Sequence, residues 1–177
     1  DITSGLKKPK QVKRERRALT EQEATAVKEV NLNPMDRFLV DLLYQFGLRP
    51  AEAFALDKRS FDRKKRTLTI NKSLAHKGEV PYIKSTKTGV TRVLPVPDSF
   101  WSKIPKAETL YFFVSGDGQL LTRAQMQRCK DRIIEAINVQ MGGNDRIKVT
   151  DMTMYTFRHN KATQLYYMQG NVSLKAK

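Results

Sequence analysis

The stretch NPMDRFLVDLLYQFGLRPAEAFAL, residues 33–56, decides the fold. Asn33 followed by Pro34 predicts a helix start, because an asparagine side chain caps free backbone N–H groups and proline fits the first turn. Apolar residues then recur every three or four positions as far as Phe46. That spacing predicts an amphipathic helix with one buried face, which Gly47 ends.

A rigid junction follows this helix. Gly47 and Pro50 frame it, and Pro50 predicts the start of a further short helix. Arg49 and Glu52 are three residues apart, so they share a face at that helix start, where Glu52 can orient the guanidinium. A surface ion pair of small energetic value is the simpler interpretation of the same two residues.

Upstream, Thr20 and Glu23 have the spacing of a capping box and predict a short helix that reaches about Val30. Residues 1–17 carry seven basic against two acidic side chains and predict a flexible basic linker or arm. We expect this arm to attract a nucleic-acid backbone. Its cations are Lys7, Lys8, Lys10, Lys13, Arg14, Arg16 and Arg17.

Downstream, the period of the apolar residues changes from helical to alternating. One alternating run lies around Ile70, and two further runs lie at 80–86 and 91–96. Thr88-Gly89 between the last two is a turn signal. Together these runs predict a three-stranded antiparallel sheet over about 67–97.

Helical spacing returns at about 121–139 and again from about 155 to 169. Cys129 falls on the apolar face of the first of these helices, so we expect a core thiol and not a reactive one. The order predicts an α+β fold, mainly helical with a small three-stranded antiparallel sheet. We expect one domain over 18–177.

Composition narrows the function. The 177 residues carry a net charge of +15, and 40% are hydrophobic. No apolar run has the roughly 18–20 residues of a membrane span. One cysteine excludes an internal disulfide, and with two histidines it also excludes a Cys/His zinc site. A strongly basic domain of this kind favours nucleic acid as partner.

Two more segments carry chemistry. Lys87 lies in the run STKTG at the predicted turn, where a lysine can swing into a groove, although a solvated turn lysine is the simpler interpretation. The run YTFRH places Tyr155, Arg158 and His159 on one helix face, and we expect Phe157 to point inward. An ordinary amphipathic helix explains the last segment equally well.

In this order, the three segments resemble the catalytic domain of the tyrosine recombinases, the phage integrase family. That family carries an arginine in a Gly-Leu-Arg-x-x-Glu context, a lysine on a β-hairpin, often within Lys-Thr-Gly, and a His-x-x-Arg-His segment. Gly47 to Glu52, Lys87, and Tyr155 to His159 match these in turn, except that Tyr155 replaces the first histidine. The resemblance covers about residues 18–177.

The resemblance implies strand cleavage of double-stranded DNA without metal or other cofactor, through a 3′-phosphotyrosyl intermediate. Arg49 and Arg158 would clamp the scissile phosphate, since a guanidinium donates two parallel bonds to phosphate. Lys87 would protonate the leaving 5′-oxygen. Glu52 and His159 would support them. Tyr155 could donate a hydrogen bond to phosphate, but a phenol is a poor base near neutral pH.

The family places its nucleophilic tyrosine some tens of residues after the second arginine, and only 19 residues follow Arg158 here. Tyr166 and Tyr167 lie too close to Arg158, and the other tyrosines precede it. We therefore expect the nucleophile to lie outside this chain, which would be a catalytic domain truncated at both ends. Such a fragment should bind DNA without cleaving it. The resemblance further implies a homotetramer on DNA for the intact protein, a monomeric fragment, and a cytoplasmic, nucleoid-associated protein of a bacterium or phage.

Three alternatives stay open. A type IB topoisomerase shares the arginine, lysine and tyrosine chemistry. A recombinase that has lost catalysis could act as a DNA-binding regulator, which Tyr155 in the histidine position permits. A basic RNA-binding domain is the third, although no aromatic stacking motif of the RRM kind is present.

Overall fold

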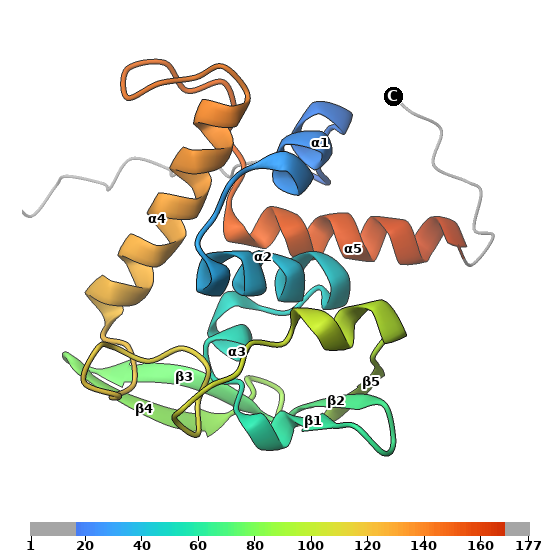
Figure 1. The fold of residues 1–177 in the computed structure, drawn as a ribbon, viewed down its shortest axis with the longest axis vertical. Coiled ribbons are helices and arrows are strands. Elements are labelled where there is room, and N and C mark those ends of the chain that lie inside the picture. The colour runs from blue at the N-terminus through green and yellow to red at the C-terminus, as the bar shows by residue number, and fades with distance from the viewer. Residues whose placement is uncertain (1–16, 169–177) are drawn as a thin grey trace, which may run out of the picture.

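The computed structural model describes residues 17–168, which form an α+β fold that is mostly helical, as predicted (Figure 1). Its α-helices lie together above two small sheets. The α-helices are α1 (Glu21–Glu29), α2 (Pro34–Phe46), α3 (Pro50–Ala53), α4 (Arg123–Gln140) and α5 (Met154–Met168). Two 3₁₀ helices are η1 (Lys58–Ser60) and η2 (Asp98–Lys103).

The starts of α1 and α2 lie where the sequence predicts them, because each is fixed by a local cap. Thr20 Oγ1 accepts a hydrogen bond from the Glu23 backbone N–H at 3.2 Å, and the Glu23 carboxylate accepts one from the Thr20 N–H at 2.9 Å. Asn33 Oδ1 accepts from the Asp36 N–H at 2.9 Å. Each contact satisfies a donor that the first helical turn leaves unpaired.

The strands of the described residues form two antiparallel sheets, not the single three-stranded sheet predicted over 67–97. The three-stranded sheet has the order β1-β2-β5, and a separate hairpin pairs β3 with β4. The strands are β1 (Phe61–Asp62), β2 (Thr67–Ile70), β3 (Lys72–Lys77), β4 (Val80–Ser85) and β5 (Arg92–Pro95).

The difference lies in strand pairing. The hairpin turn is at Gly78, whose φ of 61° suits glycine, and it folds β4 back onto β3. Thr88-Gly89 does form a turn, closed by the Gly89 N–H to the Thr86 carbonyl at 2.9 Å. However, the chain then carries β5 across to pair with β2. An alternating pattern predicts strands but does not say which strands pair.

The core is centred on α2, whose apolar face is fully buried. Phe38 on this face contacts a cluster of aromatic rings, with Phe112 at 5.2 Å and Phe113 at 5.8 Å between centroids. Along its length α2 packs against α5 (Figure 1). No helix within residues 17–168 is long and apolar enough to cross a bilayer.

Cys129 on α4 is a buried core residue, as predicted. Its thiol donates a hydrogen bond to Asp36 Oδ1 at 3.2 Å. Burial, together with the Asp36 carboxylate, raises the pKa of Cys129 to about 12. The thiol therefore stays protonated and unreactive at neutral pH.

Gly47 sets the distance between α5 and the α2–α3 junction. Its φ of 60° is left-handed, which glycine adopts without steric cost. A Cβ added here would lie 2.9 Å from Lys161 Cβ on α5. The absence of a side chain thus lets α5 approach the junction that carries Arg49.

Candidate active site

Glu52 is the centre of a cluster of charged side chains at the α2–α3 junction. It is 1% exposed, and both carboxylate oxygens are used. Oε1 accepts a hydrogen bond from Arg49 Nη1 at 2.8 Å. Oε2 accepts from the Arg49 backbone N–H at 3.0 Å and from Arg92 Nη2 at 2.5 Å. Glu52 therefore orients the Arg49 side chain, as the spacing of the two residues predicts.

Glu52 is ionised in the fold. Burial by itself would raise its pKa. The two hydrogen bonds from Arg49, with the positive charges of Arg92 and Arg49, outweigh that effect and hold the pKa of Glu52 below its usual range. A buried carboxylate that remains charged can hold two guanidinium groups in fixed positions.

Arg158 reaches the same cluster from α5. Its Nη1 donates a hydrogen bond to the Gly47 carbonyl at 2.7 Å. Burial lowers the pKa of Arg158, and the charges of Arg49 and Arg92 lower it further. The hydrogen bond to Gly47, two residues before Arg49, brings Arg158 to the junction, although 109 residues separate Arg158 from Arg49 in the sequence.

The cluster combines three guanidinium groups with one carboxylate and so has an excess of positive charge. The side chains of Arg49 and Arg92 are 32% and 30% exposed, which leaves part of each open to solvent. Arginines held in place before a ligand arrives bind and stabilise an anion without the cost of ordering them. Within residues 17–168, no group of histidine, cysteine and carboxylate side chains is placed to hold a metal ion.

Tyr155 and His159 flank Arg158 on α5, and Phe157 is fully buried, as predicted. Tyr155 is 53% exposed and lies three residues before Arg158 on α5. It lines a pocket of about 1030 Å³ that is also lined by Pro50 and Ala51 of α3. His159 is partly buried.

Lys87 is not part of the cluster. It lies in the exposed turn after β4, and within residues 17–168 its amine makes no hydrogen bond or ion pair. The neighbouring Thr86 is 5% exposed and anchors the turn, with its hydroxyl donating to the Val90 carbonyl at 3.2 Å. The structure therefore brings together Arg49, Glu52 and Arg158, and leaves Lys87 in solvent.

Arg92 is the member of the cluster that the sequence did not predict. It is the first residue of β5 and lies 40 residues from Glu52. Its one signal is its position, five residues after Lys87 at the start of a strand. Nothing in the alternating pattern indicates that its side chain turns towards the helices.

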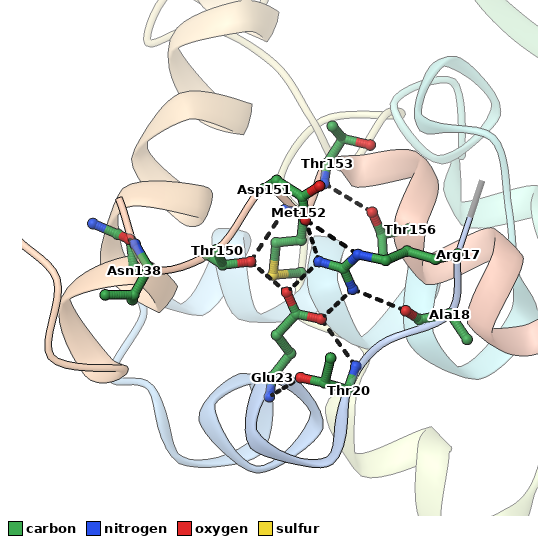
Figure 2. A network of polar contacts seen from close by, with 11 residues as sticks. Arg17, Ala18, Thr20, Glu23, Asn138, Thr150, Asp151, Met152, Thr153 and Thr156 are labelled. Carbon is green, nitrogen blue, oxygen red and sulfur yellow. Dashed lines mark hydrogen bonds and ion pairs between the residues drawn. The ribbon is translucent and has the colours of Figure 1, made fainter. Parts of the chain in front are cut away.

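The basic arm lies outside the described residues except for Arg17. Figure 2 shows that this guanidinium contacts two carboxylates of the protein, in Glu23 and Asp151. The Arg17–Glu23 pair has Nη1 to Oε2 at 2.6 Å and Nη2 to Oε1 at 2.7 Å. Arg17 thus differs from the solvated cation that the arm hypothesis expects.

Glu23, at 2% exposure, joins the start of the domain to the segment before α5. It accepts hydrogen bonds from Arg17 and from the Thr150 hydroxyl (Figure 2). Burial would raise its pKa, but these donors and the Thr20 N–H lower the pKa of Glu23 to about 2. This contact fixes where the arm enters the domain.

Six tyrosines are present in the chain, and the geometry of the last two bears on catalysis. Tyr166 and Tyr167 pack edge to face, with ring centroids 6.0 Å apart, near the end of α5. Eight residues of helix separate Tyr166 from Arg158, a rise of about 12 Å along the axis. Tyr155 is one turn from Arg158 on the same helix.

Solved structures of several DNA-processing enzymes share this fold. An integrase of transposon Tn1549, in complex with a circular intermediate DNA, is 18% identical with a TM-score of 0.65, and the match covers 88% of this chain and 55% of that one. The integrase of mycobacterium phage Brujita is 18% identical with a TM-score of 0.58, covering 97% and 50%. The XerH recombinase bound to its difH substrate is 18% identical with a TM-score of 0.56, covering 85% and 41%.

The chain spans about half the length of these matched proteins. At such identities the likeness concerns the fold, which is that of integrase catalytic domains. A family-wide sequence comparison is decisive for membership, because the profile described as "Phage integrase family" matches residues 16–175. The chain therefore belongs to the phage integrase family.

Proposed function

We propose that this chain is the catalytic domain of a site-specific DNA recombinase that cuts and rejoins strands through a 3′-phosphotyrosyl intermediate. The observation that carries the proposal is the cluster in which Glu52 holds Arg49 and Arg92, and the neighbouring Gly47 carbonyl holds Arg158. Membership of the phage integrase family and the DNA-bound neighbours support it.

In the reaction, a tyrosine hydroxyl gives its proton to water and its oxygen forms a bond to the scissile phosphorus, while the bond from phosphorus to the 5′-oxygen breaks. Negative charge grows on the non-bridging oxygens, and Arg49 and Arg158 meet it with charge-assisted hydrogen bonds. Glu52 holds Arg49 in position, and the Gly47 carbonyl holds Arg158. Fixed donors of this kind each contribute on the order of 10²–10³ in rate.

Lys87 acts as the general acid that protonates the leaving group. A proton from its ammonium passes to the departing 5′-oxygen, which leaves as a free hydroxyl. Its exposed turn is suited to this, because bound DNA can order the side chain in its groove. Tyr155 donates a hydrogen bond to the phosphate from the edge of the cluster, and His159 supports Arg158 from the next position on α5.

The attacking tyrosine is not among the six in this chain. Tyr166 and Tyr167 are more than two helical turns beyond Arg158, and Tyr44, Tyr82 and Tyr111 belong to other elements. A tyrosine of the parent protein outside residues 1–177 would supply the nucleophile. The cations of the arm, from Lys7 to Arg16, would add sequence-independent attraction to the DNA backbone.

For the parent protein we further propose a homotetramer on paired DNA sites and action on nucleoid DNA in the cytoplasm of a bacterium. The fragment by itself would then bind duplex DNA as a monomer. These proposals follow from the family and not from contacts in the structure.

A nicked suicide substrate tests the function, using the parent protein and the 177-residue chain in parallel. The parent should form a covalent protein–DNA adduct that Arg49→Ala and Arg158→Ala abolish, while much of the DNA affinity remains. Arg66→Ala is the matched control, because Arg66 pairs with Asp98 on an exposed turn away from the cluster. It should cleave like the wild type.

Each other outcome contradicts a part of the proposal. An adduct formed by the 177-residue chain, mapped to Tyr155 by mass spectrometry, would place the nucleophile inside it. DNA binding by the parent without any adduct would favour a DNA-binding regulator. Relaxation of supercoiled DNA without site preference would favour a type IB topoisomerase.

A further inference from the structure

Arg92 belongs to the cluster but has no role in the proposed reaction so far. It is the first residue of β5, and its Nη2 donates to Glu52 Oε2 at 2.5 Å. The same Glu52 oxygen accepts the Arg49 backbone N–H, while Glu52 Oε1 accepts the Arg49 guanidinium. Through one buried carboxylate, Arg92 is therefore connected to the residue that is expected to clamp the phosphate.

Arg92 also ends the loop that carries Lys87. The loop of residues 86–91 leaves β4 at Ser85, which pairs with Lys72, and enters β5 at Arg92, which pairs with Ile70. Both ends of the loop are thus fixed to positions two residues apart in the chain. Only five residues separate Lys87 from Arg92, so the lysine backbone stays within about 17 Å of this anchor.

The base of the loop is held from inside as well. Thr86 is buried, its hydroxyl donates to the Val90 carbonyl at 3.2 Å, and its carbonyl accepts the Gly89 N–H at 2.9 Å. These contacts shape the turn but do not join it to the helices. Among the described residues, the ion pair between Arg92 and Glu52 is the charged contact that joins the end of this loop to α3.

We propose that Arg92 is a positioning residue that holds the Lys87 loop against the Arg49–Glu52 junction, so that the lysine meets the leaving oxygen of the phosphate that Arg49 binds. This inference rests on the proposed function. Loss of Arg92 leaves both hydrogen bonds between Arg49 and Glu52 available. The phosphate clamp should therefore survive, while delivery of the proton by Lys87 should suffer.

The test separates these two effects by changing the leaving group. In a substrate with sulfur in place of the bridging 5′-oxygen, a thiolate departs, and it needs no proton because a thiol is far more acidic than an alcohol. The parent protein is assayed for adduct formation on the oxygen and the sulfur substrates. The variants are Arg92→Ala, Arg92→Lys, Lys87→Ala and Arg49→Ala.

We expect Arg92→Ala to slow cleavage of the oxygen substrate by about 10–100-fold, a part of what general acid catalysis contributes. On the sulfur substrate its rate should return to within about threefold of the wild type, as for Lys87→Ala. Arg49→Ala should be defective on both substrates. Arg92→Lys retains the charge that pairs with Glu52 and should recover part of the loss on the oxygen substrate.

Three results would overturn the inference. Cleavage of the oxygen substrate at the wild-type rate by Arg92→Ala would show that the residue is not needed. An equal loss on both substrates, with a folded circular dichroism spectrum, would make Arg92 a phosphate ligand. If Arg92→Ala fails to fold, Arg92→Lys is used instead, and an equal loss of its cleavage rate on both substrates would likewise make Arg92 a phosphate ligand. Failure of the wild type on both substrates would instead contradict the proposed function.

Discussion

Two regions of this molecule carry the cations expected to act on one phosphate, and they are built in opposite ways. At the α2–α3 junction, Arg49 is held by a carboxylate that is 1% exposed, and Arg158 by a backbone carbonyl. Lys87 lies in an exposed turn. Under the proposed function, the groups that stabilise charge are preorganised in the protein, whereas the Lys87 side chain takes its position when DNA binds.

One glycine in each region makes the contrast measurable. Gly47 and Gly89 have similar positive φ angles, 60° and 69°. A Cβ at Gly47 would lie 2.9 Å from Lys161 Cβ, whereas a Cβ at Gly89 would have nothing within 4 Å. The two positions therefore share a positive φ but differ in packing.

The largest effect should come from Gly47→Ala. The added methyl group must displace α5 in addition to straining the backbone, so we expect a loss of about 2–4 kcal/mol in the free energy of unfolding. Arg158 should move with α5, and adduct formation by the parent protein should fall at least 10-fold. Urea denaturation and the suicide-substrate assay measure the two. Wild-type values for both would show that α5 does not depend on this contact.

Glu52→Gln should come next, because the amide keeps the shape but loses the charge that pairs with two arginines. The pKa of Glu52 is lowered in the fold, so its charged contacts stabilise the protein above about pH 4.5 and are lost as the pH falls below that value. We expect a loss of about 1–3 kcal/mol at pH 7. The loss should shrink as the pH is lowered from 5 towards 3, which denaturation curves at each pH would measure.

Arg17→Ala tests a second guanidinium–carboxylate contact, one that lies outside the cluster. It leaves Glu23 buried without its main partner, and about 1–3 kcal/mol of stability at pH 7 should be lost. The pKa of Glu23 is about 2, so the wild type should lose this stabilisation between about pH 4.5 and 2, and the variant should lose less there. Adduct formation, corrected for the folded fraction, should change less than threefold. A fall in adduct formation as large as that expected for Gly47→Ala would mean that the contact reaches the cluster.

The smallest effect should come from Gly89→Ala in the Lys87 turn. A left-handed residue with a Cβ costs about 1 kcal/mol, and no packing penalty is added here. Thermal unfolding should show a decrease of that size. A loss equal to that of Gly47→Ala would remove the contrast between a packed and an exposed region.

Local signals in the sequence predict the helices of this fold well. The caps at Thr20 and Asn33 and the left-handed Gly47 act within a few residues, so their patterns can be read without tertiary context. The pairing of the strands could not be predicted from local signals. The choice of β2 as partner for β5 depends on contacts between residues some 25 positions apart, and the alternating apolar pattern does not specify that choice.

The same distinction between local and long-range contacts explains which parts of the site were predictable. The Arg49–Glu52 contact spans three residues and was predictable from spacing. The contact between Arg92 and Glu52 spans 40 residues and required the fold. Arg158 was identified by resemblance, but its dependence on the Gly47 carbonyl appears only when α5 is packed against the junction. The ion pair between Arg17 and Asp151 was also not predictable, because the two residues are distant in the sequence.

The central claim is that the cluster around Glu52 binds the scissile phosphate. A structure of the parent protein with duplex DNA that contains its cleavage site tests this most directly. We expect a backbone phosphate with its non-bridging oxygens at about 3 Å from the guanidinium nitrogens of both Arg49 and Arg158. DNA bound across another face, with the cluster open to solvent, would contradict it.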